Sequence, residues 1–131
     1  MSTTKSINNQ MKKEVLKLDF NKKSLQAKLN AFGFKDGEFY ILYIPSLEIS
    51  AYGDDYNDAM QMLKESLDVF SEDIFNIPIK NAKNLLKKLG WQPNKIFKKK
   101  MEQTKNISPE YLIKEYNLPD NTTIKSIPIA I

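Results

Sequence analysis

The sequence predicts an α+β fold in which helices pack on one face of an antiparallel sheet of three to four strands. Two stretches that alternate apolar and polar residues precede an Asp36–Gly37 turn signal, and an aromatic, apolar stretch at 39–45 follows it. A long amphipathic stretch then begins near residue 56. Alternation with period two is typical of half-buried strands, whereas apolar recurrence every three to four residues is typical of a helix that buries one side.

The first half of the chain supplies the predicted strands. Residues 15–20 and 25–34 alternate between apolar and polar types, and Asp-Gly at 36–37 suits a tight hairpin turn with positive φ. The aromatic strand at 39–45 therefore pairs antiparallel with 25–34, and it ends at Pro45 because proline cannot donate to a sheet ladder. A short fourth strand is expected over 49–52.

The long helix follows a glycine and two aspartates. Gly53 is expected to adopt a backbone angle that other residues resist. Asp55 is the predicted N-cap, because its carboxylate can accept hydrogen bonds from the free amides of the first turn. Asp58 adds negative charge near the positive end of the helix dipole. The stripe that this helix is expected to bury comprises Ala59, Leu63, Ser66, Leu67, Phe70 and Ile74.

The second half of the chain predicts two more helices and an edge strand. A helix at 80–89 stops at Gly90, and Trp91 directly after it is expected to be buried. Ser108 followed by proline predicts the start of a short helix that ends near residue 117. Residues 122–131 are β-branched, and Pro128 makes them an edge strand.

The predicted organisation is a disordered tail at 1–11 and a single domain over 12–131, whose C-terminal part is a helical and edge-strand extension. The tail is predicted from a polar stretch without hydrophobic periodicity.

The ordered combination of these elements resembles the N-terminal domain of HicB-family antitoxins over about residues 25–75. The matching residues are Tyr40–Pro45, Leu47, Tyr52–Asp54, Asp58–Ala59 and the helix up to Phe70. The chain has Leu47-Glu48-Ile49 where the family usually has a Pro-Gly-Cys type of turn. The resemblance implies a non-catalytic antitoxin that blocks a HicA-like toxin, a small ribonuclease, by direct contact.

Family members often carry a C-terminal helix-turn-helix or ribbon-helix-helix that binds operator DNA. Here the candidate helices at 80–89 and 109–116 are separated by too long a connection for helix-turn-helix geometry. A ribbon-helix-helix needs a strand directly before two adjacent helices, and the sequence predicts none. Operator binding is therefore disfavoured.

The composition excludes several kinds of chemistry. The chain of 131 residues has no cysteine and no histidine, so disulfides, Cys/His zinc sites, cysteine nucleophiles and histidine bases are all absent. Asp54, Asp55 and Asp58 form the densest carboxylate group, and helix capping explains them better than a metal site. No catalytic residue, metal or cofactor is predicted. The sequence shows neither a signal peptide nor an apolar run long enough to cross a bilayer, so a cytoplasmic location without membrane contact is expected.

Charge is strongly segregated along the chain, although the net charge is only +4. Residues 36–75 carry ten acidic residues against one lysine, and residues 76–105 carry nine lysines against one glutamate. Because an RNA-cutting partner must be basic, the acidic helix face is the predicted partner-binding surface. Its residues are Asp55, Asp58, Glu65, Asp68 and Glu72. The sequence is also compatible with a homo-oligomer.

The alternative function is an RNA-binding or regulatory adaptor that uses the lysine-rich segment 80–105. Its candidate nucleic-acid-binding residues are Lys95, Lys98, Lys99 and Lys100, which surround Ile96 and Phe97. The absence of arginine disfavours this alternative, because bidentate phosphate contacts favour arginine. The favoured interpretation of the segment is a solvated connection whose Ile96 and Phe97 dock on the core.

Overall fold

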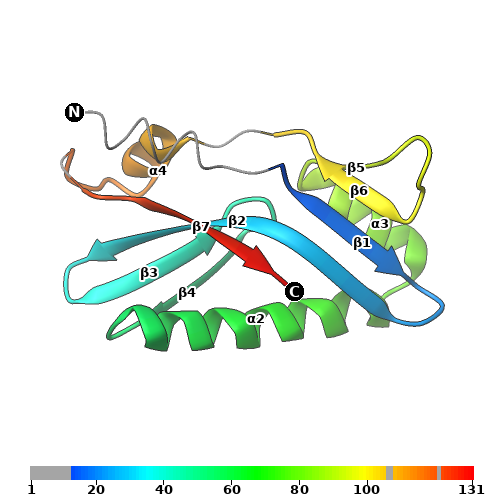
Figure 1. Cartoon of the computed structure of the whole chain (residues 1–131), viewed down its shortest axis with the longest axis horizontal. Helices are drawn as coiled ribbons and strands as arrows, with labels where there is room; N and C mark the ends of the chain where they lie inside the picture. The colour runs from blue at the N-terminus through cyan, green and yellow to red at the C-terminus, as the bar shows by residue number, and fades with distance from the viewer. Residues whose placement is uncertain (1–12, 106–107, 121) are drawn as a thin grey trace.

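The computed structural model describes residues 13–105, 108–120 and 122–131, so the predicted tail at 1–11 lies outside the described residues. The order of helices and strands is shown in Figure 1. The elements are β1 (Val15–Asp19), β2 (Ser24–Asp36), β3 (Phe39–Ile44), β4 (Ile49–Gly53), α2 (Tyr56–Asn76), α3 (Ile79–Lys88), β5 (Trp91–Pro93), β6 (Lys100–Gln103), α4 (Pro109–Glu115) and β7 (Lys125–Ala130).

The sheet confirms the α+β class but is larger than expected. Across the described residues it has seven strands, in the order β4-β3-β2-β1-β6-β5, with β7 paired to β2. All pairings are antiparallel. The expected three to four strands correspond to β1–β4, and the predicted edge strand is β7. The strands β5 and β6 were not predicted from the sequence, because they are only three and four residues long.

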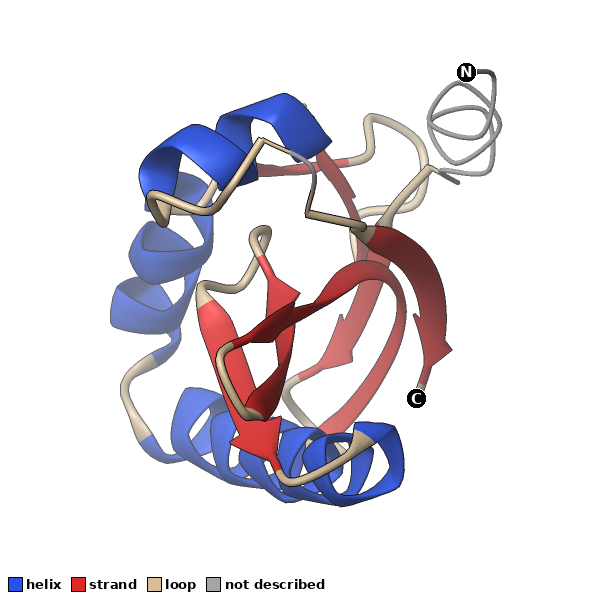
Figure 2. Cartoon of the chain, turned by 90° about the vertical axis from the view of Figure 1, so that its left-hand side faces the viewer, coloured by secondary structure: helices blue, strands red, loops and turns tan. Residues whose placement is uncertain are grey.

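The long strand β2 holds the sheet together, because each part of it pairs with a different neighbour. Ser24–Lys28 pairs with β1, Lys28–Gly33 with β7, and Phe32–Asp36 with β3. Figure 2 shows that the resulting sheet is strongly curved. The thirteen residues of the curved strand β2 thus pair with three different strands.

Helices lie on both faces of the sheet, so the expectation of helices on one face is wrong (Figures 1 and 2). The inner face carries Leu16, Leu18 and Leu29, which share the main core with buried residues of α2 and α3. Because successive side chains of a strand point to opposite faces, Phe32 and Phe34 of β2 lie on the outer face. They form a second cluster with Leu112 of α4 and with Leu118 and Ile124, which lie in the link from α4 to β7.

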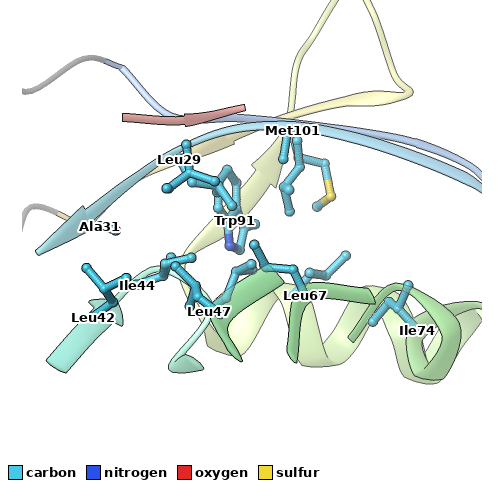
Figure 3. Packing of buried hydrophobic residues seen from close by; sticks show 14 of the residues in the cluster. Leu29, Ala31, Leu42, Ile44, Leu47, Leu67, Ile74, Trp91 and Met101 are labelled. Atoms are coloured by element: carbon cyan, nitrogen blue, oxygen red, sulfur yellow. The ribbon is translucent and has the colours of Figure 1, made fainter. Parts of the chain in front are cut away.

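Trp91 lies in the middle of the main core, as expected. It is fully buried, and its indole N–H donates to the carbonyl oxygen of Ser46 at 2.8 Å. Figure 3 shows the ring between Leu29 and Met101 on the sheet side and Leu67 on the helix side. Trp91 therefore joins β5 to the loop after β3 as well as filling the space beneath the sheet.

The local signals around the glycines are confirmed with one correction. Gly37 has φ 65° and Gly90 has φ 101°, as a hairpin turn and a helix stop require. Gly53 does not have positive φ. It is needed for space instead, because a Cβ there would lie 2.5 Å from the backbone nitrogen of Ala59 and 2.8 Å from Asp58. Gly53 lets the first turn of α2 approach the end of β4.

Candidate functional site

The solvent side of α2 carries a straight stripe of acidic and apolar residues. Successive helical residues are about 100° apart, so the positions 58, 62, 65, 69 and 72 fall within an arc of roughly 80°. The stripe consists of Asp58, Met62, Glu65, Val69 and Glu72, all of them exposed. Met62 is 45% exposed and Val69 is 55% exposed, although both are apolar. This acidic stripe lies about 140–180° around the helix from the buried residues Leu63 and Leu67.

Two of the five predicted partner-binding residues serve the helix terminus. The Asp55 carboxylate accepts from the backbone N–H of Asp58 at 2.8 Å, which confirms Asp55 as the N-cap. The Asp58 carboxylate in turn accepts from the backbone N–H of Asp54 at 3.0 Å. Such reciprocal bonds satisfy amides that the helix itself cannot pair. Asp55 and Asp58 are therefore committed to structure, although both remain exposed.

The other three predicted residues are available to a partner. Glu65, Asp68 and Glu72 are exposed on α2, and within the described part of the chain none of them forms an ion pair. Glu65 and Glu72 belong to the acidic stripe, and Asp68 flanks it. Met62 and Val69 were not among the residues predicted from sequence, although their spacing of seven residues on the polar side of a helix could have indicated them.

The four predicted nucleic-acid-binding lysines lie in the loop from β5 to β6 and at the start of β6. Lys95, Lys98 and Lys99 are exposed, and Lys100 is half-buried. The interpretation that Ile96 and Phe97 dock on the core is wrong, because they are 80% and 65% exposed.

The loop that carries these lysines is nevertheless held by hydrogen bonds. The Asn94 carboxamide oxygen accepts from the backbone N–H groups of Ile96 and Phe97, each at 2.9 Å. The Asn94 N–H donates to the Lys100 carbonyl oxygen at 2.7 Å, and the Lys100 N–H donates to the Phe97 carbonyl oxygen at 2.9 Å.

A hollow of about 680 Å³ lies on the outer face of the sheet, beside this loop. The helix α4 covers Phe32 and Phe34 at one end of this face and leaves the other end open. Five lysines line the hollow, namely Lys17, Lys28, Lys98, Lys99 and Lys100. Apolar residues and one glutamine complete the lining: Val15, Ala27, Phe97, Ala130, Ile131 and Gln26. Lys17 and Lys28 were not among the residues predicted from sequence, and they come from strands more than fifty residues before the loop.

Two ion pairs border this face. Lys99 lies 3.0 Å from the Asp19 carboxylate, and this contact is the main cause that lowers the pKa of Asp19. Lys13 lies 3.3 Å from Glu102 and likewise is the main cause that lowers the pKa of that carboxyl. Lys17, Lys28, Lys98 and Lys100 have no ion-pair partner among the described residues. The open face therefore keeps an excess of positive charge.

Glu14 is a half-buried carboxylate that joins three segments. It accepts from the backbone N–H of Asn30 at 2.8 Å and from the Ser46 hydroxyl at 2.9 Å. Burial raises its pKa, and these two hydrogen bonds oppose the shift. Glu14 thus holds the start of β1 to the middle of β2 and to the loop after β3, a structural task.

Comparisons with family models, curated proteins and solved structures found no match. Among the described residues, no three side chains of the metal-binding types come together as a ligand set. In the same part of the chain, no helix has the length and apolar character to cross a membrane. Within the described part of the chain, the acidic stripe and the lysine-lined hollow are the two surfaces that we consider as candidate binding sites.

Proposed function

We propose that this protein is a non-catalytic, HicB-like binding module that neutralises a small basic ribonuclease through the exposed side of α2. The observation that carries this proposal is the acidic stripe, which combines the available carboxylates of Glu65 and Glu72 with the exposed side chains of Met62 and Val69. Such a mixture differs from an ordinary solvated helix side, which is polar throughout.

The chemistry of the stripe matches a surface that holds RNA. A ribonuclease needs basic side chains to bind phosphate, and an acidic helix can occupy the same side chains and exclude the RNA. Complementary charge raises the rate of association more than the final affinity. Met62 and Val69 supply the apolar area on which slow dissociation depends.

The resemblance of residues 25–75 to the HicB family supports the same proposal and names the class of partner, a HicA-like toxin. Operator DNA is not part of the proposal. The helices α3 and α4 are separated by β5 and β6, whereas a helix-turn-helix joins its two helices by a turn of three to four residues. The absence of histidine and cysteine supports a role in binding rather than in catalysis.

The test uses a small basic HicA-like ribonuclease as the partner, sought first in the open reading frame next to the one that encodes this chain. We expect that protein to cleave RNA and the purified chain to suppress the cleavage at a molar ratio near one. The chain alone should cleave no RNA, with or without magnesium. Cleavage that persists with the chain in excess contradicts the proposal, as does magnesium-dependent cleavage by the chain that Asp54→Asn abolishes.

Charge reversal locates the surface. The triple variant Glu65→Lys, Asp68→Lys and Glu72→Lys should slow association by about 10-fold or more at low salt. A matched control reverses three exposed acidic residues elsewhere, Glu38, Glu110 and Glu115. Both variants change the net charge equally, so equal association rates would show that α2 does not form the interface.

A further inference from the structure

We infer that the lysine-lined hollow on the outer face binds single-stranded nucleic acid, with Lys17, Lys28, Lys98 and Lys100 contacting phosphates and Phe97 stacking on a base. This site is separate from the acidic stripe, because the stripe lies on a helix that packs against the inner face of the sheet. It also differs from the lysine segment expected from sequence, since β1 and β2 supply part of it.

Strand register brings the lysines together. Lys17 of β1 lies directly opposite Lys100 of β6 on one side and opposite Gln26 of β2 on the other. Lys28 of β2 lies between Val15 of β1 and Ala130 of β7. Directly opposed residues share a face, so these side chains all stand on the outer face.

The lysines are in an arrangement that an anion would stabilise. Like charges directly opposite each other destabilise a sheet, and Lys17 faces Lys100 with no ion pair to either among the described residues. Among the residues that the structure describes, the ion-pair partner of Asp19 is Lys99, at 3.0 Å. A bound phosphate chain would neutralise this repulsion.

Phe97 is placed to act as a stacking platform. Its ring lines the hollow while it remains 65% exposed. The hydrogen bonds from Asn94 fix the backbone that carries it, so little ordering of the loop is needed when a ligand binds. Stacking of bases on an aromatic ring tolerates any sequence.

The basic surface continues along β1. A second hollow of about 250 Å³ shares Lys17, Gln26 and Lys99 with the first and adds Lys22, together with Asp19, whose carboxylate pairs with Lys99. The strand β1 has five residues and is therefore about 17 Å long. A strip of this length suits several consecutive phosphates, whereas a single phosphorylated metabolite would use only part of it.

The chemistry favours a single strand over a duplex or a peptide. Lysine is a flexible point charge without the bidentate geometry that reads guanine, so sequence-specific duplex recognition is not expected. An acidic peptide would satisfy the lysines but would leave Phe97 without a stacking partner. A flexible strand satisfies both features, because phosphates and base faces alternate along it.

Fluorescence anisotropy with labelled oligouridine and oligothymidine of about 12 nucleotides tests the inference, since known sites span roughly 4–16 nucleotides. We expect both to bind, with affinity that falls steeply as salt is added. Tighter binding of oligouridine would mark RNA as the ligand, and tighter binding of oligothymidine would mark DNA. Absence of binding to both at low salt would overturn the inference.

Neutral variants test the position of the site. Lys17→Gln, Lys28→Gln and Lys100→Gln together should weaken binding about 100-fold at ~0.1 M salt, because each phosphate contact contributes ~0.7 to the salt slope. The control changes Lys80, Lys83 and Lys87, which are exposed on α3. This control variant has the same net charge, and its affinity should fall by no more than about threefold, because salt screens the effect of distant charges. Equal losses of affinity in both variants would show that the hollow is not the binding site.

Phe97 variants separate stacking from apolar contact. Phe97→Ala should weaken oligouridine binding about 5- to 150-fold, the usual loss for one stacked base. Phe97→Leu keeps an apolar side chain without the ring face, and its affinity for oligouridine should fall nearly as much. Full affinity in Phe97→Leu would contradict stacking. Polyglutamate or anionic phospholipid vesicles that bind as tightly as oligouridine would show that the hollow takes a different ligand.

Discussion

Replacement of Trp91 by alanine should be among the most destabilising single changes in this protein. The ring is fully buried between the sheet and α2, and its N–H donates to the Ser46 carbonyl oxygen at 2.8 Å. A buried tryptophan covers about 150–250 Å². At about 25 cal/mol per Å² this area corresponds to roughly 4–6 kcal/mol, an upper value because unfolded chains already bury part of it.

The expected loss is therefore about 3–5 kcal/mol, which matches measured losses for tryptophan to alanine in protein cores. Trp91→Phe keeps an aromatic ring but leaves the Ser46 carbonyl oxygen without its indole donor. It should cost about 1–3 kcal/mol. The difference between the two variants measures the packing that a phenyl ring retains at this position.

Urea denaturation followed by far-ultraviolet circular dichroism is the suitable assay. Trp91 is the only tryptophan, so fluorescence cannot follow its own replacement. Wild-type fluorescence should instead show emission shifted to the blue of free tryptophan. Phe97→Ala is the matched control, because that ring is 65% exposed and its loss should change stability by no more than about 0.5 kcal/mol. A Trp91→Ala variant that loses less than about 1 kcal/mol would refute the reasoning.

Three further changes test local features by urea denaturation. Asp55→Ala should cost about 1 kcal/mol, because the backbone N–H of Asp58 loses its acceptor; an unchanged midpoint would remove Asp55 from the cap. Gly53→Ala should cost about 1–3 kcal/mol, since its Cβ would meet the backbone of α2 at 2.5 Å, and a neutral result would refute the close approach. The raised pKa of Glu14 means that the native state holds this proton more tightly than the unfolded state. The free energy of unfolding of the wild type should therefore contain a contribution from Glu14. This contribution is lost as the pH rises from the unfolded-state pKa, about 4.3, through the raised pKa of the native state. Glu14→Gln keeps an acceptor for Asn30 and should lack that decline, so an identical pH profile would exclude Glu14 as its source.

Local sequence signals determined most of the elements. Period-two alternation, Asp36–Gly37 and Pro45 predicted the meander from β1 to β4, because each signal acts over a few residues. The N-cap Asp55 and the positive-φ Gly90 marked where α2 begins and α3 ends. The acidic helix side was also visible, since residues that share a helix side recur at fixed spacing.

Other features depended on contacts between distant segments. The strands β5 and β6 are too short to show periodicity, and they form because β1 offers a free edge to Lys100–Glu102. The helix α4 packs on the outer face because Phe32 and Phe34 need cover there, which alternation alone does not assign to a particular helix.

The lysine-lined hollow is the clearest case of a site that only the tertiary structure decides. The sequence by itself determined that Lys17, Lys28 and Lys100 are polar positions. Their common face follows from the register of β1 with β2, its neighbour in the chain, and from the register of β1 with β6, which lies more than seventy residues further along. Register between distant strands is set by the burial of their opposite faces against α2 and α3, and that burial is a property of the whole fold.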